Sequence, residues 1–138
     1  MGLFSRLFGG AESQASAYDP RGPVVIVVRD SGKALADALR TDARAVVVLS
    51  HRETAIEEHI ANQRPSVIVM SIESDGKNGF LITKSIKTKS ALRGIPVVLF
   101  SAEATRETFD QHAKLRTRAD AYVTGTDPVD IKAAVDAL

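Results

Sequence analysis

From Pro23 onward, apolar positions alternate between short continuous runs and longer stretches with helical spacing. The short runs consist mainly of Val, Ile and Leu, which is typical of strands buried on both faces of a parallel sheet. Five strands are predicted in this way: Val24–Val28, Ala45–Leu49, Val67–Ser71, Val97–Phe100 and Ala121–Val123.

Helices are predicted between these strands, where apolar residues recur every three to four positions. They comprise a stretch after Ser31-Gly32, then Arg52–Gln63, Phe80–Lys87, Ala104–Leu115 and the segment that begins at Asp127-Pro128. The last has the clearest start, because Asp is a favoured N-cap and Pro a favoured first helical residue. The predicted buried residues of the first four are, in order, Leu35, Ala38 and Leu39; Ala55, Ile56, His59 and Ile60; Phe80, Leu81 and Ile86; and Phe109, Ala113 and Leu115.

Strict alternation of strands and helices predicts an α/β fold: a flavodoxin-like, doubly wound, five-stranded parallel sheet of order 2-1-3-4-5, with helices on both faces. In such a sheet a site forms where the strands end, near the point at which strand order reverses. We therefore expect functional residues around Val28-Arg29-Asp30, Ser71-Ile72-Glu73 and Phe100-Ser101-Ala102.

The first 22 residues differ in character and are predicted to form a flexible tail ahead of a domain at 23–138. Leu3, Phe4, Leu7 and Phe8 fall on one helical face before Gly9-Gly10 interrupts the pattern. This patch is interpreted either as a frayed terminus or as a short hook for a partner groove, with membrane contact through residues 3–8 the least favoured reading.

Composition narrows the functional classes. The 138 residues include no cysteine, which excludes disulfides, thiolate catalysis and zinc–cysteine sites. A formal net charge of +1 and 5% aromatic residues give no argument for nucleic-acid binding. No apolar run is long enough to cross a bilayer, and the expected location is cytoplasmic. Neither a cofactor nor a bound metal is expected, because His51, His59 and His112 lack a metal-binding spacing.

Several segments together resemble the receiver domain of bacterial two-component response regulators, a CheY-like fold. They are Pro65 through Ser71 to Asn78-Gly79, Pro96–Ala102 and Arg118–Val123. The resemblance implies a phosphorylation site with an acidic pair, an acceptor aspartate, a Thr or Ser, a switch aromatic and a lysine. At those positions the sequence has Arg29 and Asp30, Ser71, Ser101, Tyr122 and Gly125.

The substitutions predict a degenerate site. Ser71 offers no carboxylate to accept a phosphoryl group, and Gly125 offers no cation to neutralise one. Arg29 is interpreted either as an internal replacement for the metal ion that neutralises Asp30, or as a solvated side chain. The resemblance thus implies a non-enzymatic pseudo-receiver in a signalling or motility complex, which binds a protein partner. Candidate partner residues are Glu107, Gln111, Lys114, Arg116 and Tyr122.

The same sequence supports other interpretations. Thr124-Gly125-Thr126 precedes a helix and could cradle an anion or a flavin phosphate, which would make the chain a small-ligand or anion-sensing module. Ser71 could be the substrate of a kinase. A basic cluster around the third predicted helix is either a docking face for an acidic partner or a solvated helix surface; it consists of Lys84, Lys87, Lys89 and Arg93. The chain could also be a fragment of a longer protein.

Overall fold

Parallel strands build a single sheet in the computed structural model, which describes residues 15–41, 44–73 and 78–138. The Leu3–Phe8 patch lies outside the described residues. The five strands have the order β2-β1-β3-β4-β5, which confirms the predicted fold class and strand order. Their bounds are β1 (Val24–Val28), β2 (Val46–Ser50), β3 (Val67–Ser71), β4 (Val97–Ser101) and β5 (Ala121–Thr124).

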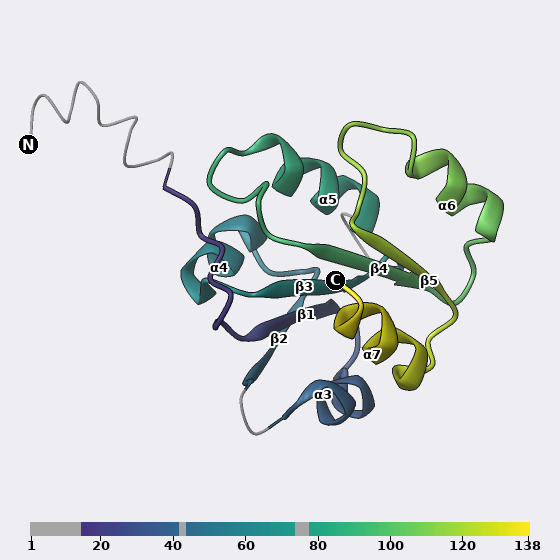
Figure 1. The fold of residues 1–138 in the computed structure, drawn as a ribbon, viewed down its shortest axis with the longest axis horizontal. Coiled ribbons are helices and arrows are strands. Elements are labelled where there is room, and N and C mark those ends of the chain that lie inside the picture. Colours follow the sequence, from purple (N-terminus) through teal and green to yellow (C-terminus); the bar gives the residue numbers. More distant parts are fainter. Residues whose placement is uncertain (1–14, 42–43, 74–77) are drawn as a thin grey trace, which may run out of the picture.

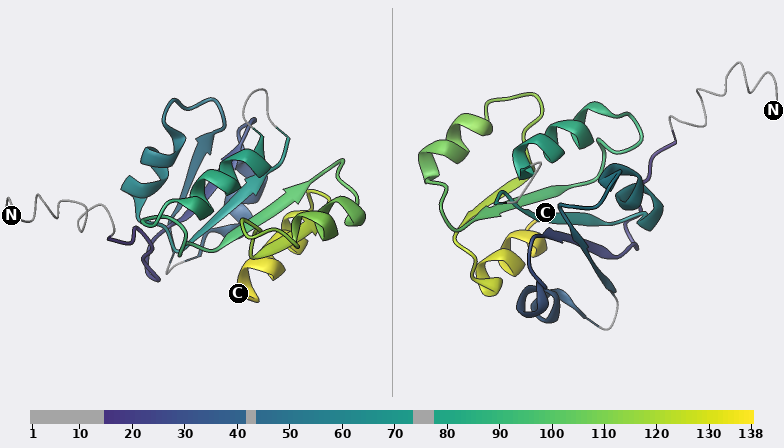
Figure 2. Two further views of the ribbon diagram at one scale, coloured as in Figure 1. Left: turned by 90° about the horizontal axis from the view of Figure 1, so that it is seen from above. Right: turned by 180° about the vertical axis from the view of Figure 1, so that it is seen from behind.

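Helices cover both faces of the sheet (Figures 1 and 2). Within the described residues they are α3 (Lys33–Leu39), α4 (Ile56–Gln63), α5 (Gly79–Thr88), α6 (Arg106–His112) and α7 (Pro128–Asp136). One core layer lies between the sheet and α3 with α7, and the other lies beneath α4, α5 and α6. Val25 and Val27 point into the second layer while Ile26 points into the first, as the two-residue period of a strand requires.

Two predicted helices are shorter in the structure. The helix predicted from Arg52 begins at Ile56, because Ala55 adopts a left-handed conformation with φ of 56° and interrupts a regular helix there. The helix predicted to reach Leu115 ends at His112. By contrast, the predicted start of the last helix is confirmed, since the Asp127 side chain accepts the Val129 N–H.

The predicted buried faces need five corrections. Ala55, which lies just before α4, is exposed. His59 is exposed and lies 3.7 Å from Glu53, whereas Ile56 and Ile60 carry the buried face of α4. On α5, Leu81 is 53% exposed and Ile82 is fully buried, because Ile82 and Ile86 lie one turn apart facing the sheet. Ala113 and Leu115 are both exposed, which leaves Phe109 as the predicted buried residue of α6.

Lys87 does not share the exposed environment of the other three residues in the predicted basic cluster. Lys87 is largely buried, and its Nζ lies 2.8 Å from Asp120 while donating to the Ile95 carbonyl. It therefore ties α5 to the loop before β5, and it does not belong to a solvated cationic face. Lys84, Lys89 and Arg93 remain exposed.

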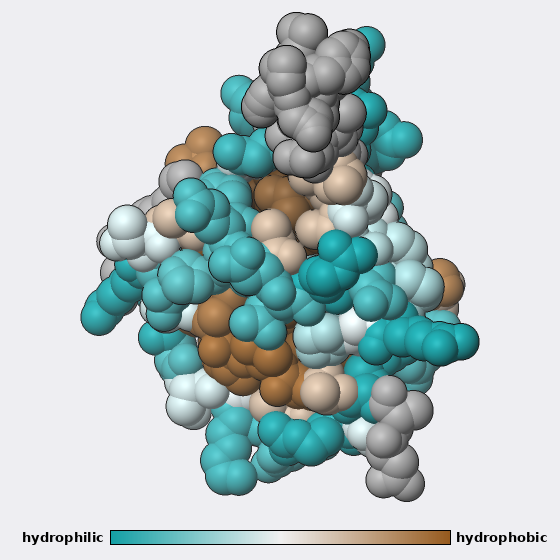
Figure 3. All heavy atoms as spheres, turned by 90° about the vertical axis from the view of Figure 1, so that its left-hand side faces the viewer, coloured by the Kyte–Doolittle hydropathy of each residue, from teal (hydrophilic) through white to brown (hydrophobic). Residues whose placement is uncertain are grey.

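The described part of the N-terminal segment contacts the domain. Ala17 is buried and its N–H donates to the Ala91 carbonyl at 2.7 Å, although the sequence predicts a flexible tail as far as residue 22. None of the helices in the described ranges has the length and apolar character that a bilayer crossing requires. The side of the molecule in Figure 3, which carries the edge strand β2, shows apolar side chains gathered between polar ones, and Val48 of this strand is exposed.

Candidate functional site

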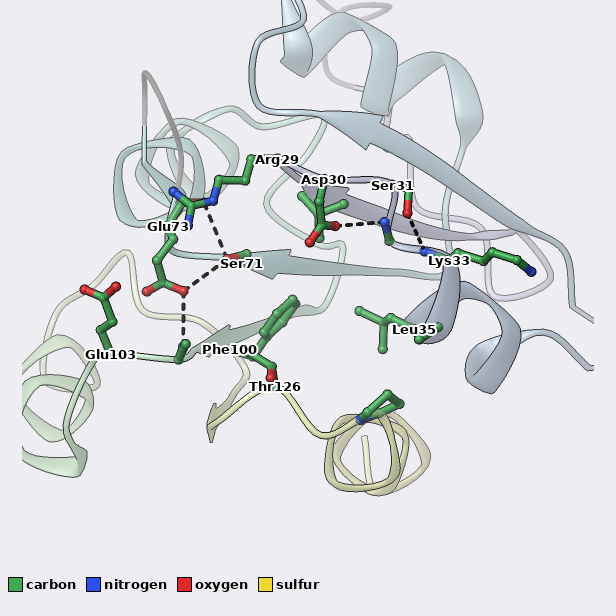
Figure 4. Close-up of a pocket in the computed structure, with 15 residues that line it drawn as sticks. Arg29, Asp30, Ser31, Lys33, Leu35, Ser71, Glu73, Phe100, Glu103 and Thr126 are labelled. Carbon is green, nitrogen blue, oxygen red and sulfur yellow. Dashed lines mark hydrogen bonds between the residues drawn. The ribbon is translucent and has the colours of Figure 1, made fainter.

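A cavity of about 430 Å³ opens at the carboxyl edge of the sheet, where the fold class predicts a site. Arg29, Asp30 and Ser71 line it, together with Glu73 and Thr126 (Figure 4). Ser101 and Gly125 lie beside this cavity and not in its lining. The parallel register explains the gathering, because Ser71 stands opposite Phe100 and Ser101 opposite Thr124.

Ser71 ends β3 and is 8% exposed, so the folded domain gives a kinase little access to it. Its hydroxyl lies 3.3 Å from Glu73 Oε1 and 3.4 Å from the Glu73 carbonyl oxygen. These distances exceed the usual range for an O–H···O hydrogen bond, and they do not indicate a serine activated by an adjacent base. The helix that follows packs directly on this residue, since a Cβ at Gly79 would lie 2.6 Å from the Ser71 carbonyl oxygen.

Glu73 is the site residue that the sequence analysis did not single out. Its carboxylate extends from the end of β3 toward the end of β4 (Figure 4). One carboxylate oxygen accepts the Ser101 hydroxyl, and the other accepts the Ala102 N–H at 3.1 Å. In the sequence, Glu73 lies two residues after Ser71, the predicted end of a strand. This position places Glu73 at the correct edge of the sheet but does not indicate where its side chain points.

Ser101 is fully buried and joins the site to the loop before α6. While its hydroxyl donates to Glu73, the same oxygen accepts the N–H groups of Glu103 at 3.1 Å and Ala104 at 2.8 Å. Behind it, the Gly125 N–H donates to the Ser101 carbonyl at 2.7 Å. This hydroxyl therefore holds the start of the β4–α6 loop.

The residues after β1 do not form the acidic pair of a magnesium site. The Asp30 carboxylate accepts the Gly32 N–H at 2.8 Å and so closes the turn before α3. Arg29 extends away from Asp30 (Figure 4), an orientation that does not support its neutralising this carboxylate. Mg²⁺ prefers an octahedral oxygen set with carboxylates, and a set built on Arg29, Asp30 and Ser71 does not fit it. In the ranges that the structure describes, no three His, Asp or Glu side chains are placed to hold a metal ion.

Gly125 contributes no side chain to the pocket. It adopts a φ of 103°, a conformation that favours glycine, although a Cβ there would meet no atom within 4 Å. A lysine at this position would be opposed by backbone strain and not by lack of space. Thr126 and Pro128 line the cavity on this side instead.

His51 is a buried residue whose environment the sequence does not reveal. Its Nε2 lies 2.8 Å from the Ser71 carbonyl oxygen, which can only accept, so this nitrogen carries the proton. Its Nδ1 is buried without a hydrogen-bond partner among the described residues. His51 thus fixes the backbone of Ser71 from the β2 side of the sheet.

A second cluster lies on α6 and β5. The Tyr122 hydroxyl oxygen accepts the Ala119 N–H at 3.0 Å and lies 2.6 Å from His112 Nδ1. Because the amide can only donate, the Tyr122 proton is free to donate to His112, which is then neutral. Burial lowers the pKa of His112 and raises the pKa of Tyr122, in agreement with this arrangement.

Aromatic contacts connect this cluster to the core. The Phe80 and His112 rings lie 4.4 Å apart between centroids, and the Phe109 and Tyr122 rings lie 5.0 Å apart. The predicted partner residues differ in burial: Tyr122 is half-buried, whereas the other four are exposed. Those four are Glu107, Gln111, Lys114 and Arg116.

Comparisons with known proteins agree with the fold. No family model and no curated protein matches the sequence. Among solved structures, the chain is similar to the chemotaxis response regulator CheY4 of Vibrio cholerae, with a TM-score of 0.69 and 15% identity over 84% of this chain and 97% of that chain. It is also similar to the BeF3-activated receiver domain of RstA from Klebsiella pneumoniae, with a TM-score of 0.66 and 25% identity over 83% and 96% of the two chains. The fold is therefore that of response-regulator receiver domains.

Proposed function

We propose that this chain is a pseudo-receiver domain: it has the receiver fold, takes no phosphoryl group, is not an enzyme and acts by binding a protein partner. The observation that carries the proposal is the composition of the site. A serine ends β3, and the hydroxyl and amide donors of Ser101 and Ala102 are already bound to Glu73.

Phosphoryl transfer depends on positioning and on neutralising charge with metal and cationic side chains. The residues at the positions that the resemblance assigns to this site supply neither the acceptor carboxylate nor the lysine and paired carboxylates that phosphoryl transfer would need. Ser71 has a hydroxyl where an acyl phosphate needs a carboxylate, and Gly125 stands where a lysine would contact the phosphoryl oxygens. Arg29 replaces one carboxylate of the acidic pair, and Asp30 is bound to a turn amide.

The partner surface is the side formed by α6, β5 and α7. Its polar residues are exposed and carry both charges, as the rim of a protein interface does. Leu115 is 48% exposed beside them, and Val129 is exposed on α7. Tyr122 reaches this surface from β5 while its hydroxyl is held by His112, which presents a fixed aromatic group at its centre.

The proposed biological setting is bacterial signalling or motility in the cytoplasm. Gly76–Ile82, Phe109–Leu115 and Ala119–Val123 resemble the pseudo-receiver of FrzS, a polar motility protein of gliding myxobacteria. That resemblance implies a docking module of a motility or polarity complex. Gly125 departs from it, because a lysine is expected there in that relative.

The direct test of phosphorylation is intact mass after incubation with Mg²⁺ and acetyl phosphate. We expect no added mass, and a gain of about 80 Da, that of one phosphoryl group, would refute the proposal. The partner surface is tested by capture from native cells with Leu115→Glu, using Leu81→Glu as the matched control on α5. Leu115→Glu should lose the partner that wild type retains, and Leu81→Glu should keep it.

The cavity favours one other function, a small-ligand sensor. Val28, Leu35 and Phe100 give it apolar walls, and Arg29 with Thr126 adds polar groups. Flavin mononucleotide or phosphate would then raise the melting temperature of the wild-type domain in a saturable manner. Absence of such a shift, together with loss of capture by Leu115→Glu, would favour the pseudo-receiver.

A further inference from the structure

Two hydrogen-bond donors converge on one carboxylate beside the cavity. They are the Ser101 hydroxyl and the Ala102 N–H, which both donate to Glu73, and the Ser71 hydroxyl lies 3.3 Å from the same carboxylate. We propose that these donors form an oxyanion-binding site that the chain fills with its own Glu73 carboxylate. The inference rests on the proposed function, since it assumes that no phosphoryl group occupies this place.

The donors belong to the framework of the sheet, and Glu73 is the part that can be removed. Ser71 and Ser101 end two adjacent strands, and Ala102 follows Ser101 directly. Ser101 is fully buried, so its hydroxyl cannot turn outward to water when its acceptor is lost. Hydrogen bonds to an ionised acceptor are stronger than neutral ones, which favours a carboxylate or another oxyanion here.

The bound carboxylate also determines the orientation of the Ser101 hydroxyl. A hydroxyl has one proton and two lone pairs. The proton goes to Glu73, which leaves the lone pairs to accept the N–H groups of Glu103 and Ala104. Those amides lie just before Thr105, the N-cap of α6. Glu73 is thus a positioning residue for the loop that begins α6.

The consequence is a domain held in one arrangement by an internal anion. α6 carries Phe109 and His112, which contact Tyr122 of the proposed partner surface. With Glu73 in place, the loop before α6 has its anion permanently, and no added anion is needed to order it. An added oxyanion should bind only when Glu73 is absent.

The first test is amide hydrogen exchange in Glu73→Ala, with Glu103→Gln as the matched control. Both changes remove one carboxylate from the rim of the same cavity. We expect the Ala102 amide to exchange at least about tenfold faster in Glu73→Ala, since the lost charge-assisted bond supplies about a factor of ten or more. The Glu103 and Ala104 amides should also exchange faster, because the Ser101 hydroxyl that accepts them loses its own acceptor. Glu103→Gln should leave them unchanged. Equal exchange in wild type and Glu73→Ala would overturn the proposal.

The second test uses inorganic phosphate as the probe. Phosphate should produce saturable amide shifts at Ser101 and Ala102 in Glu73→Ala and restore slow exchange there, while wild type and Glu103→Gln show no saturable shift. Faster exchange that phosphate does not reverse would mean that Glu73 only caps the loop, which would refute the oxyanion site.

A third variant covers the case in which Glu73→Ala does not fold. Glu73→Asp keeps the charge but is one methylene shorter, so it should show intermediate exchange and weak phosphate binding; wild-type behaviour would count against the proposal. Intact mass after acetyl phosphate treatment separates the two proposals. Added mass on wild type refutes the pseudo-receiver function, whereas unchanged exchange in the Glu73 variants without added mass refutes this inference alone.

Discussion

The hydroxyl of Tyr122 offers a sharp test of how the α6–β5 surface is held. Replacing Tyr122 with Phe removes the acceptor of the Ala119 N–H at 3.0 Å and the donor to His112 Nδ1 at 2.6 Å. Ala119 and His112 are both buried, so each is left with a polar group without its partner. A buried group that loses its hydrogen bond costs about 1–3 kcal/mol. Because Tyr122 itself is half-buried and water can reach part of the gap, we expect a loss of about 2 kcal/mol.

Urea unfolding of wild type and Tyr122→Phe measures this loss as a difference in the free energy of unfolding. With a slope of about 1–3 kcal/mol per molar urea for a small domain, the midpoint should fall by about 1 M. Tyr18→Phe is the matched control, because Tyr18 is 37% exposed and the change should stay within about 0.5 kcal/mol. If Tyr122→Phe were as stable as Tyr18→Phe, the hydroxyl would not hold this surface.

Three further predictions concern charge and backbone conformation. Burial lowers the pKa of His112, so its contribution to stability is fully present above the ordinary histidine pKa of about 6.5 and is lost as pH falls below that value. The free energy of unfolding, measured between pH 5 and 8, should therefore fall toward low pH, and His112→Gln should reduce this pH dependence. Gly125→Ala should cost about 1 kcal/mol through strain at φ of 103°, whereas Gly94→Ala should cost much less, and equal thermal shifts would refute the strain argument. Asp120→Asn should destabilise the domain by about 1–3 kcal/mol, since this carboxylate accepts the Val97 N–H at 2.7 Å and forms an ion pair with the largely buried Lys87. Asp136→Asn, which removes an exposed ion pair, should change stability by less than about 1 kcal/mol, and similar losses in both variants would contradict this ranking.

The site divides between what the sequence predicts and what it leaves undetermined. Ser71, Asp30 and Ser101 could be placed at one edge because parallel strands bring their carboxyl ends together, and that follows from the order of the elements. The direction of a long side chain does not follow from it. Glu73 turns toward β4, where the Ala102 N–H donates to it, and Arg29 turns away from Asp30 (Figure 4). The direction of Glu73 thus depends on a donor that is distant in sequence.

The α/β class, the strand order and the presence of a serine at the end of β3 follow from the sequence alone. These depend on local features: apolar runs, the Asp127-Pro128 helix start, and which residue occupies a strand end. Three-dimensional packing is what buries His51 and leaves His59 exposed, turns Ile82 and not Leu81 toward the sheet, and brings Glu73 to the Ser101 hydroxyl. A helix can rotate by one residue without changing its apolar pattern much, and a polar side chain selects its partner from groups that are distant in sequence, so packing alone settles both.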